Sequence, residues 1–273
     1  MTVDLNQTSS VAEAFGRKSV VYDAFGKDHE NLTRMRERVY GAITRQLKPG
    51  SHLLEINAGT GFDAVQMVTR GYSVHATDLS AGMVDSIKEK IVKHEIGSRL
   101  TAEELSFTEL NQVQNGPFDG VYSNFGGLNC VPDLSEVTRH LPSILRPGGL
   151  AIWVIMPRIC PWELGLMFKD WRVATRRFRP DGVMANVEGV QFKTWYFSPG
   201  QAIRAFGPQF ECVGLEGLSV VTPSADNKTF ALNRPKLFRR LVTLDENIST
   251  TWPFNRMGDF FILTMKLKEA KRS

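Results

Sequence analysis

The chain has 273 residues, of which 42% are hydrophobic and 23% charged, and its formal net charge is +4. No apolar run approaches the roughly 18 residues that span a bilayer, and no basic-then-apolar leader opens the chain. These features argue against a membrane span and favour an ordinary cytoplasmic enzyme, built as one large domain or as one domain with insertions. The three cysteines and five histidines lie without metal-ligand spacing, so we expect reduced thiols and no metal site.

The first informative pattern is a short apolar run that ends in a glycine turn. Leu53, Leu54 and Ile56 lead into residues 57–61, Asn-Ala-Gly-Thr-Gly. Glycine lacks a Cβ, so this backbone can take positive φ angles and approach a ligand closely, and asparagine tolerates the same left-handed region. A plain tight loop is the simpler interpretation of a lone Gly-x-Gly, but the residues on either side favour a ligand-binding turn.

Two acids flank the turn. Glu55 lies inside the apolar run, where a buried carboxylate is costly without a partner such as a cofactor amine or its waters. Residues 72–78 alternate between apolar and polar side chains, as a strand does, and end in Asp78. An acid about 20 residues after the glycines is placed to accept hydrogen bonds from ribose hydroxyls.

A helix is expected next, with Ser80 as its N-cap and an inward stripe formed by Met83, Ile87 and Ile91. Strand, turn, helix, strand and helix then form a unit that holds an adenosine-containing cofactor. Residues 59–64, Gly-Thr-Gly-Phe-Asp-Ala, also satisfy the dinucleotide pattern Gly-x-Gly-x-x-Ala. A nicotinamide or flavin enzyme is therefore an open alternative.

Further strands follow downstream. Residues 118–124, Phe-Asp-Gly-Val-Tyr-Ser-Asn, predict one strand, and residues 150–156 predict another. Between them, residues 145–149, Leu-Arg-Pro-Gly-Gly, predict a helix stop and a turn, because proline cannot continue a helix and glycine closes it.

With these segments the chain resembles the class I S-adenosylmethionine-dependent methyltransferases. Their first motif runs acid-x-Gly-x-Gly-x-Gly, and Glu55, Asn57, Gly59 and Gly61 occupy its places, with asparagine instead of the first glycine. The likeness covers residues 15–156 well and the rest as a loose outline. It implies an α/β fold: a Rossmann-like, doubly wound, seven-stranded mixed sheet with helices on both faces. The cofactor-binding residues that it implies are Tyr22, Arg36, Glu55, Asn57, Ala58, Gly59, Gly61, Asp78, Leu79, Met83, Ser106, Phe107, Asn124 and Phe125.

Two segments depend on this resemblance for their interpretation. Residues 101–104, Thr-Ala-Glu-Glu, could begin a helix as a capping box, whereas the family outline requires a third strand here, and we follow the outline. Ser106 and Phe107 would then border the adenine. Residues 1–48 resemble the family's N-terminal lid, in which Tyr22 and His29 are candidates for contacting the methyl acceptor. An ordinary surface helix carrying these two side chains is the alternative.

The second half of the chain resembles insertions that build a substrate pocket, and the likeness divides the chain as follows. Residues 49–157 form the cofactor-binding half, 158–198 an inserted substrate cap, and 199–273 the remainder with a helical insertion. The cap is expected to hold an amphipathic helix and a strand near a hairpin, and its tryptophans suggest a partly apolar acceptor, with plain core packing as the alternative. The further elements expected are a helix over 161–178, a strand over 189–196, a helix over 198–206, a strand over 210–221, a helix over 236–244 and a strand over 260–267.

The resemblance therefore implies a methyltransferase that uses S-adenosyl-L-methionine and modifies a small molecule. A nicotinamide-dependent oxidoreductase and a protein that binds the cofactor without methylating are the alternatives. Arg172, Arg176, Arg177 and Arg179 could meet nucleic acid, but a solvated helix face is the commoner use of such a cluster. No zinc knuckle, RNA-binding signature or basic tail accompanies it, so no nucleic-acid partner is expected. The oligomeric state stays open.

Overall fold

The computed structural model describes residues 7, 10–14, 29–187 and 189–269. A seven-stranded sheet forms its centre, in the order β3-β2-β1-β4-β5-β9-β8. Strands β1 to β5 are parallel, and β9 runs antiparallel to both β5 and β8. The strands are β1 (His52–Ile56), β2 (Ser73–Asp78), β3 (Leu100–Glu104), β4 (Phe118–Ser123), β5 (Leu145–Ile155), β8 (Phe210–Leu218) and β9 (Phe260–Leu267).

Helices cover both faces of this sheet. One hydrophobic cluster joins α2 and α3 to the sheet through Met35, Ile43 and Met67, and another joins α5, α6 and α9 to the opposite face through Leu141 and Phe206. The predicted doubly wound architecture is therefore confirmed. The helices are α2 (Glu30–Gln46), α3 (Phe62–Thr69), α4 (Ala81–Lys93), α5 (Ser135–Thr138), α6 (Leu141–Ile144), α7 (Pro161–Leu164), α8 (Trp171–Thr175), α9 (Pro199–Ala205), α10 (Thr229–Asn233) and α11 (Pro235–Ile248).

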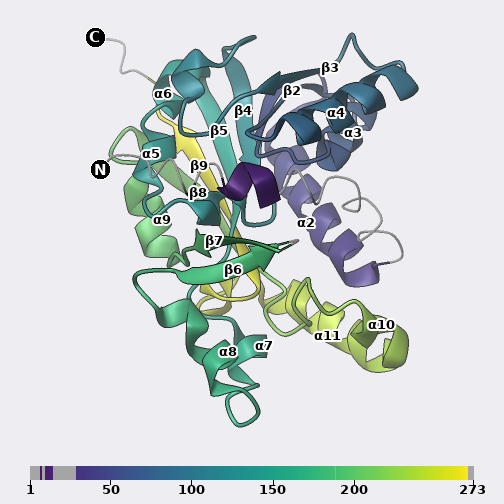
Figure 1. Cartoon of the computed structure of the whole chain (residues 1–273), viewed down its shortest axis with the longest axis vertical. Helices are drawn as coiled ribbons and strands as arrows, with labels where there is room; N and C mark the ends of the chain where they lie inside the picture. Colours follow the sequence, from purple (N-terminus) through teal and green to yellow (C-terminus); the bar gives the residue numbers. More distant parts are fainter. Residues whose placement is uncertain (1–6, 8–9, 15–28, 188, 270–273) are drawn as a thin grey trace.

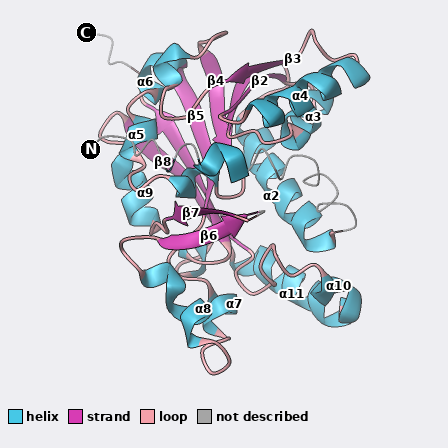
Figure 2. Ribbon diagram, viewed as in Figure 1, coloured by secondary structure: helices cyan, strands magenta, loops and turns pink. Residues whose placement is uncertain are grey.

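A separate antiparallel hairpin consists of β6 (Val183–Val187) and β7 (Val190–Thr194). It lies beyond the lower end of the large sheet in Figure 2, at the end where the parallel strands terminate. Asn129 fastens the hairpin to the sheet, because its Nδ2 donates to the carbonyls of Trp195 at 2.6 Å and Met156 at 3.2 Å. The hairpin thus faces the carboxyl ends of the parallel strands, where a doubly wound fold binds its ligands.

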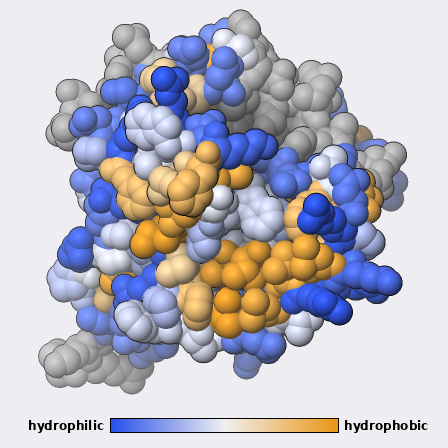
Figure 3. All heavy atoms as spheres, turned by 90° about the horizontal axis from the view of Figure 1, so that it is seen from below, coloured by the Kyte–Doolittle hydropathy of each residue, from blue (hydrophilic) through white to orange (hydrophobic). Residues whose placement is uncertain are grey.

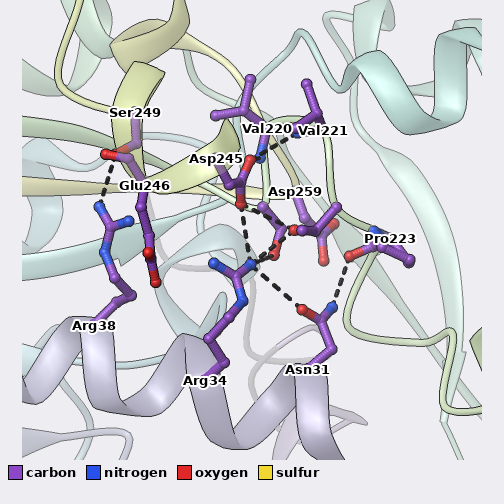
Figure 4. Close-up of polar contacts among 12 residues, drawn as sticks. Asn31, Arg34, Arg38, Val220, Val221, Pro223, Asp245, Glu246, Ser249 and Asp259 are labelled. Atoms are coloured by element: carbon purple, nitrogen blue, oxygen red, sulfur yellow. Dashed lines mark hydrogen bonds and ion pairs between the residues drawn. The ribbon is translucent and has the colours of Figure 1, made fainter. Parts of the chain in front are cut away.

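Helix α2 is tied to the second half of the chain by polar contacts (Figure 4). Arg34 donates to Asp245 at 3.0 Å and to Thr222 at 2.7 Å, and Asn31 donates to the carbonyl of Pro223 at 2.7 Å. Asp245 also accepts the backbone N–H of Val220. These buried bonds fix α2 against the loop that follows β8.

Most predicted elements are present. Residues 100–104 form strand β3, so the predicted strand is confirmed and the alternative, a helix with a capping box, is wrong. Three other features differ from the predictions. The helix stop before Leu145 is confirmed, yet Leu145 already pairs with Phe118, so residues 146–149 form a bulge inside β5 rather than a turn before it. Ser80 is the N-cap residue of α4, but its side chain makes no capping hydrogen bond.

The third difference concerns the helix predicted over residues 161–178. The structure breaks it into α7, α8 and a short 3-10 turn, Arg176–Phe178. Asp170 explains the break, because its carboxylate accepts the N–H groups of Arg172 and Val173 and so begins a new helix. The amphipathic pattern indicated that the segment is partly buried, but it did not show that the helix is interrupted.

Candidate active site

The glycine turn and Asp78 are joined directly. The backbone N–H of Gly59 donates to Asp78 Oδ2 at 2.8 Å, and the N–H of Ser80 donates to Oδ1 at 2.9 Å. Asp78 is only 8% exposed, and burial raises its pKa although these backbone hydrogen bonds act to lower it. Each carboxylate oxygen has a further lone pair, so Asp78 can still accept from a ribose hydroxyl.

Asn57 stands in place of the family's first glycine and takes a left-handed backbone conformation. Its φ is +49°, in the left-handed region that a glycine would occupy, followed by Gly59 at +57° and Gly61 at +76°. Its side chain accepts a hydrogen bond from Ser123 Oγ at 2.6 Å and donates to the carbonyl of Asn124 at 3.3 Å. The amide therefore ties the end of β1 to the end of β4, which a glycine could not do.

A cavity of about 710 Å³ opens at these strand ends. This is within the range of roughly 300 to 1,000 Å³ typical of small-molecule sites. Its wall on the sheet side is made by nine of the residues predicted to bind the cofactor: Asn57, Gly59, Asp78, Leu79, Met83, Ser106, Phe107, Asn124 and Phe125.

Two observations show that this wall suits a ligand. A Cβ added to Gly59 would meet no atom within 4 Å, so the glycine leaves open space beside the backbone. Asn124 is 7% exposed, yet its Nδ2 and Oδ1 have no hydrogen-bond partner among the described residues. A buried amide is costly when unpaired, and these two atoms are therefore available to a polar ligand. The residues present thus fit an adenosine-containing cofactor.

Four predicted cofactor residues lie behind this wall or beside it rather than on it. Glu55 is buried and accepts from the hydroxyl of Tyr122 at 2.9 Å, so the protein itself supplies one partner for this carboxylate, and its predicted role in binding the cofactor stays a prediction. Burial, with the nearby charge of Asp63, raises the pKa of Glu55 well above its usual value. Ala58 and Gly61 are also absent from the cavity wall.

Arg36, the fourth, lies close to the cavity. Its guanidinium carbon is 4.2 Å from the centre of the Phe62 ring and 5.8 Å from that of Phe125, which does line the cavity. Its Nε lies 3.4 Å from Asp63 Oδ1. Arg36 therefore supports an aromatic residue of the cavity wall.

Of the two side chains predicted to contact the acceptor, only His29 belongs to the described residues, and it does not line the cavity. Tyr22 lies outside the described residues, so its role stays a prediction. His29 is 1% exposed and forms the N-cap of α2. Its Nδ1 accepts from the N–H of Leu32 at 3.3 Å, and its Nε2 lies 2.7 Å from the carbonyl oxygen of Ala225. This position ties α2 to a loop and does not line the cavity.

The opposite wall of the cavity contains residues that sequence reasoning did not single out, apart from Trp195. Val131, Met184, Phe192 and Trp195 give it an apolar character, and Glu136 adds a carboxylate. Cys130 also lines it, and burial raises the pKa of this thiol to about 12, so it is neutral at pH 7. The other wall residues are Gln7, Ser10, Val11, Ala12, Thr108, Gly127, Pro132, Pro180, Asp181, Gln191 and Lys193.

The arginine cluster is only partly a solvated face. Arg177 is 3% exposed, and its Nη2 donates to Glu163 at 2.6 Å and to Asp259 at 2.8 Å. Arg176 makes two further bonds to Glu163, at 3.0 and 2.7 Å. Cys160, Glu163 and Asp259 together offer ligand atoms of the kind that bind metals, but the guanidinium of Arg177 joins the two carboxylates.

Comparison with known proteins agrees with this geometry. A family model described as a methyltransferase domain matches residues 53–149. A demethylmenaquinone methyltransferase of Corynebacterium glutamicum is 25% identical over 199 residues, which cover 70% of this chain and 79% of that protein. The DhpI–SAH complex has a similar fold, with a TM-score of 0.61 at 13% identity over 97% of this chain and 99% of DhpI. The cyclase SpnF gives 0.54 at 14% identity, over 86% of this chain and 81% of SpnF.

The fold and the glycine turn define a Rossmann-like protein built to hold an adenosine-containing cofactor. With the matches above, residues 53–149 are a methyltransferase domain, and the chain is similar to the class I S-adenosylmethionine-dependent methyltransferases. The predicted family, cofactor and methylation of a small molecule are thereby confirmed, and the nicotinamide alternative finds no support in these matches. No helix in the described part of the chain is long and apolar enough to cross a membrane.

Proposed function

We propose that the chain methylates a partly apolar small molecule that binds in the same cavity as S-adenosylmethionine. The observation that carries this proposal is the composition of the cavity of about 710 Å³ at the strand ends. Its sheet-side wall has the residues of a nucleoside site, whereas its far wall, from the β6–β7 hairpin and residues 130–136, is largely apolar. Two chemically different walls favour two ligands side by side.

When bound, the cofactor supplies a methyl group on a sulfonium centre, which is already a good leaving group. The protein then acts mainly by alignment. Asp78 would accept from the ribose hydroxyls, and the bare backbone at Gly59 would let the amino-acid part approach. Ser106 and Phe107 would border the adenine. The unpartnered amide of Asn124 would fix the polar end of a ligand where the two walls meet.

Glu136 is the cavity-lining group best suited to move a proton from the acceptor. It lies in α5, and burial, together with the nearby Asp133, raises the pKa of its carboxyl. A carboxylate whose pKa lies closer to the working pH is a better general base. A hydroxyl acceptor would need such a base, whereas an amine could react without one.

The apolar far wall points to an acceptor that is itself partly apolar. Phe192 and Trp195 present aromatic surface, and Met184 adds an unbranched, adaptable side chain. The similarity to a demethylmenaquinone methyltransferase supports the same class of acceptor.

Calorimetric titration with S-adenosylmethionine, its demethylated product and NAD tests the cofactor part of this proposal. We expect the first two to bind and NAD not to bind; tight binding of NAD alone would overturn it. Turnover is then measured with methyl-labelled cofactor against a panel of aromatic and isoprenoid acceptors. Cofactor binding without labelling of any acceptor would favour a protein that binds the cofactor without methylating.

A further inference from the structure

Two segments project from the lower end of the molecule in Figure 1: α7–α8 with the turn between them, and α10–α11. They contact each other, because the rings of Trp162 and Phe230 meet edge to face with centroids 5.3 Å apart. Residues of both segments also line an open groove of about 760 Å³. We call the exposed side chains of residues 166–179 and 228–244 the basal face.

Large apolar side chains stand free on this face. Phe168 is fully exposed, Trp171 is 62% exposed, and Phe178, nearby in the sequence, is 47% exposed. Such side chains are unfavourable in water, and several together on one surface mark an interaction site. Figure 3, seen from below, shows the hydrophobic surface gathered in two areas with strongly hydrophilic side chains beside them.

The second projecting segment adds an amphipathic helix. Leu237, Leu241 and Leu244 recur at helical spacing along α11; Leu237 and Leu244 are exposed, and Leu241 is half-buried. Leu232 of α10 is 66% exposed as well. Phe238, on another side of the same helix, is buried and holds α11 to the protein. The leucine stripe is therefore available to a partner without unfolding the helix.

Most of this segment is basic. Residues 228–244 contain five basic side chains and no Asp or Glu, and α11 then continues through the buried Asp245 and the exposed Glu246. All of the basic side chains except Lys228 are exposed, and Lys228 is half-buried; the five are Lys228, Arg234, Lys236, Arg239 and Arg240. A basic amphipathic helix beside exposed aromatic side chains is the pattern that binds to a membrane surface.

We propose that the basal face docks on the surface of a bilayer that contains anionic lipids. Phe168 and Trp171 would enter the headgroup region, and Arg239 and Arg240 would meet the anionic headgroups. A bilayer suits this face better than nucleic acid, because projecting aromatic and leucine side chains need an apolar medium that a phosphate backbone does not offer.

The position of the face relative to the cavity supports the same occupant. The chain passes from Phe178 directly to Pro180 and Asp181, which line the cavity. Docking through the basal face therefore brings the cavity wall close to the lipid surface. The inference stands apart from the identity of the acceptor, since it rests on the outer side chains alone.

Cosedimentation of the full chain with vesicles tests this proposal. Vesicles of phosphatidylcholine with phosphatidylglycerol are compared with vesicles of phosphatidylcholine alone, at low and high salt. We expect binding to the anionic vesicles only, and weaker binding at high salt, since salt screens the basic side chains. Absence of binding to anionic vesicles overturns the proposal.

Two paired variants locate the surface. Phe168→Ser with Trp171→Ser removes the aromatic side chains, and Arg239→Gln with Arg240→Gln removes two charges, for which we expect a loss of vesicle affinity of roughly 25-fold. Val92→Ser and Lys93→Gln with Arg99→Gln are the matched controls, because these exposed residues lie in or just after α4, far from the basal face. Equal binding by basal and control variants would contradict the assignment.

The same variants distinguish the other occupants. Light scattering that shows a dimer broken by the basal variants, with no vesicle binding, would assign the face to a second copy of the chain. If the chain binds a nucleic-acid duplex but not vesicles, and the arginine variants abolish this binding, the basal face would be assigned to nucleic acid. Either result overturns the proposal. Circular dichroism and cofactor titration check that each variant is folded.

Discussion

The backbone N–H of Gly59 donates to the carboxylate of Asp78 across 2.8 Å, so the glycine turn and the end of the second strand form one unit. The turn cannot move without disturbing the acid, and the acid cannot rotate without losing the turn. This coupling means that the ribose position and the backbone path beside it are set together. In the same turn, Gly59 and Gly61 have different structural roles.

Gly59 and Gly61 are predicted to fail in different ways when replaced by alanine. At Gly59 the new Cβ meets no atom within 4 Å, whereas at Gly61 it would lie 2.8 Å from Ile87 Cγ1. Gly59→Ala should cost about 1 to 2 kcal/mol of stability, from its left-handed φ alone, yet weaken cofactor binding at least tenfold because the Cβ enters the ligand's space. Gly61→Ala should lose about 1 to 3 kcal/mol of stability beyond the loss in Gly59→Ala, because its Cβ overpacks against Ile87.

The measurements are urea unfolding and titration with S-adenosylhomocysteine. Each variant is the other's control, because both place alanine at a positive φ in the same turn. If Gly59→Ala keeps the affinity of the native chain, the open space beside it is not where the ligand lies.

Asn124→Leu should impair binding without harming the fold. Its amide atoms have no partner among the described residues, so a leucine of similar size removes an unpaired buried polar group. We expect unchanged or slightly higher stability, together with weaker cofactor binding or a lower rate of methyl transfer.

Asn129→Leu is the matched control. That amide makes three hydrogen bonds, to Met156 O, Trp195 O and Met156 N. Its loss should destabilise the chain by about 2 to 5 kcal/mol, because the partners are left unpaired. Equal stability losses in the two variants, by thermal unfolding, would show that Asn124 is held by the protein and not by a ligand.

Glu136→Gln tests the proposed base. For a hydroxyl acceptor we expect kcat to fall by roughly 10²- to 10⁴-fold with little change in cofactor affinity. In the native chain kcat should rise with pH as the Glu136 carboxyl, whose pKa is raised by burial, loses its proton. That limb of the pH profile should vanish in the variant. Asp133→Asn is the comparison: it removes a charge that raises the Glu136 pKa, so the limb should remain but move to lower pH. An unchanged profile in Glu136→Gln would exclude the carboxylate as the base.

The sheet-side wall of the cavity could be predicted from the sequence far better than the far wall, for a physical reason. Asn57, Gly59 and Asp78 belong to a local strand-turn-helix-strand unit, whose geometry follows from spacing within about 20 residues. Glu136 and Phe192 line the same cavity although they lie far apart in the sequence, and Asn129 bonds to the chain at Trp195, 66 residues away. No local pattern records that contact.

The partners of Glu55 and His29 were missed for a related reason. A carboxylate inside an apolar strand indicates that it has a hydrogen-bond donor as partner. The sequence alone does not show whether that donor is the hydroxyl of Tyr122 or an amine of the cofactor. His29 carried no signal that its imidazole would face the carbonyl of Ala225 from a distant loop. The type of group could be inferred, and the tertiary fold decided the partner.

Acid should destabilise the chain partly through Glu163. Burial acts to raise the pKa of this carboxyl, but the hydrogen bonds from Arg176 and Arg177 outweigh it and lower the pKa below its ordinary value of 4.5. A folded-state pKa below the unfolded one gives stability that is present above about pH 4.5 and is lost as pH falls through the folded pKa. Glu163→Gln should therefore be less stable near pH 7, by about 1.5 to 3 kcal/mol for each lost charged hydrogen bond.

The difference between native chain and Glu163→Gln should narrow as urea unfolding is repeated from about pH 7 down to about pH 3, where the native carboxyl is also neutral. Glu37→Gln is the control: it removes a carboxylate that is 58% exposed and paired with Arg70, and an exposed pair contributes less than about 1 kcal/mol. A stability gap that stays constant over this range would mean that Glu163 holds the two arginines by shape alone and not by charge.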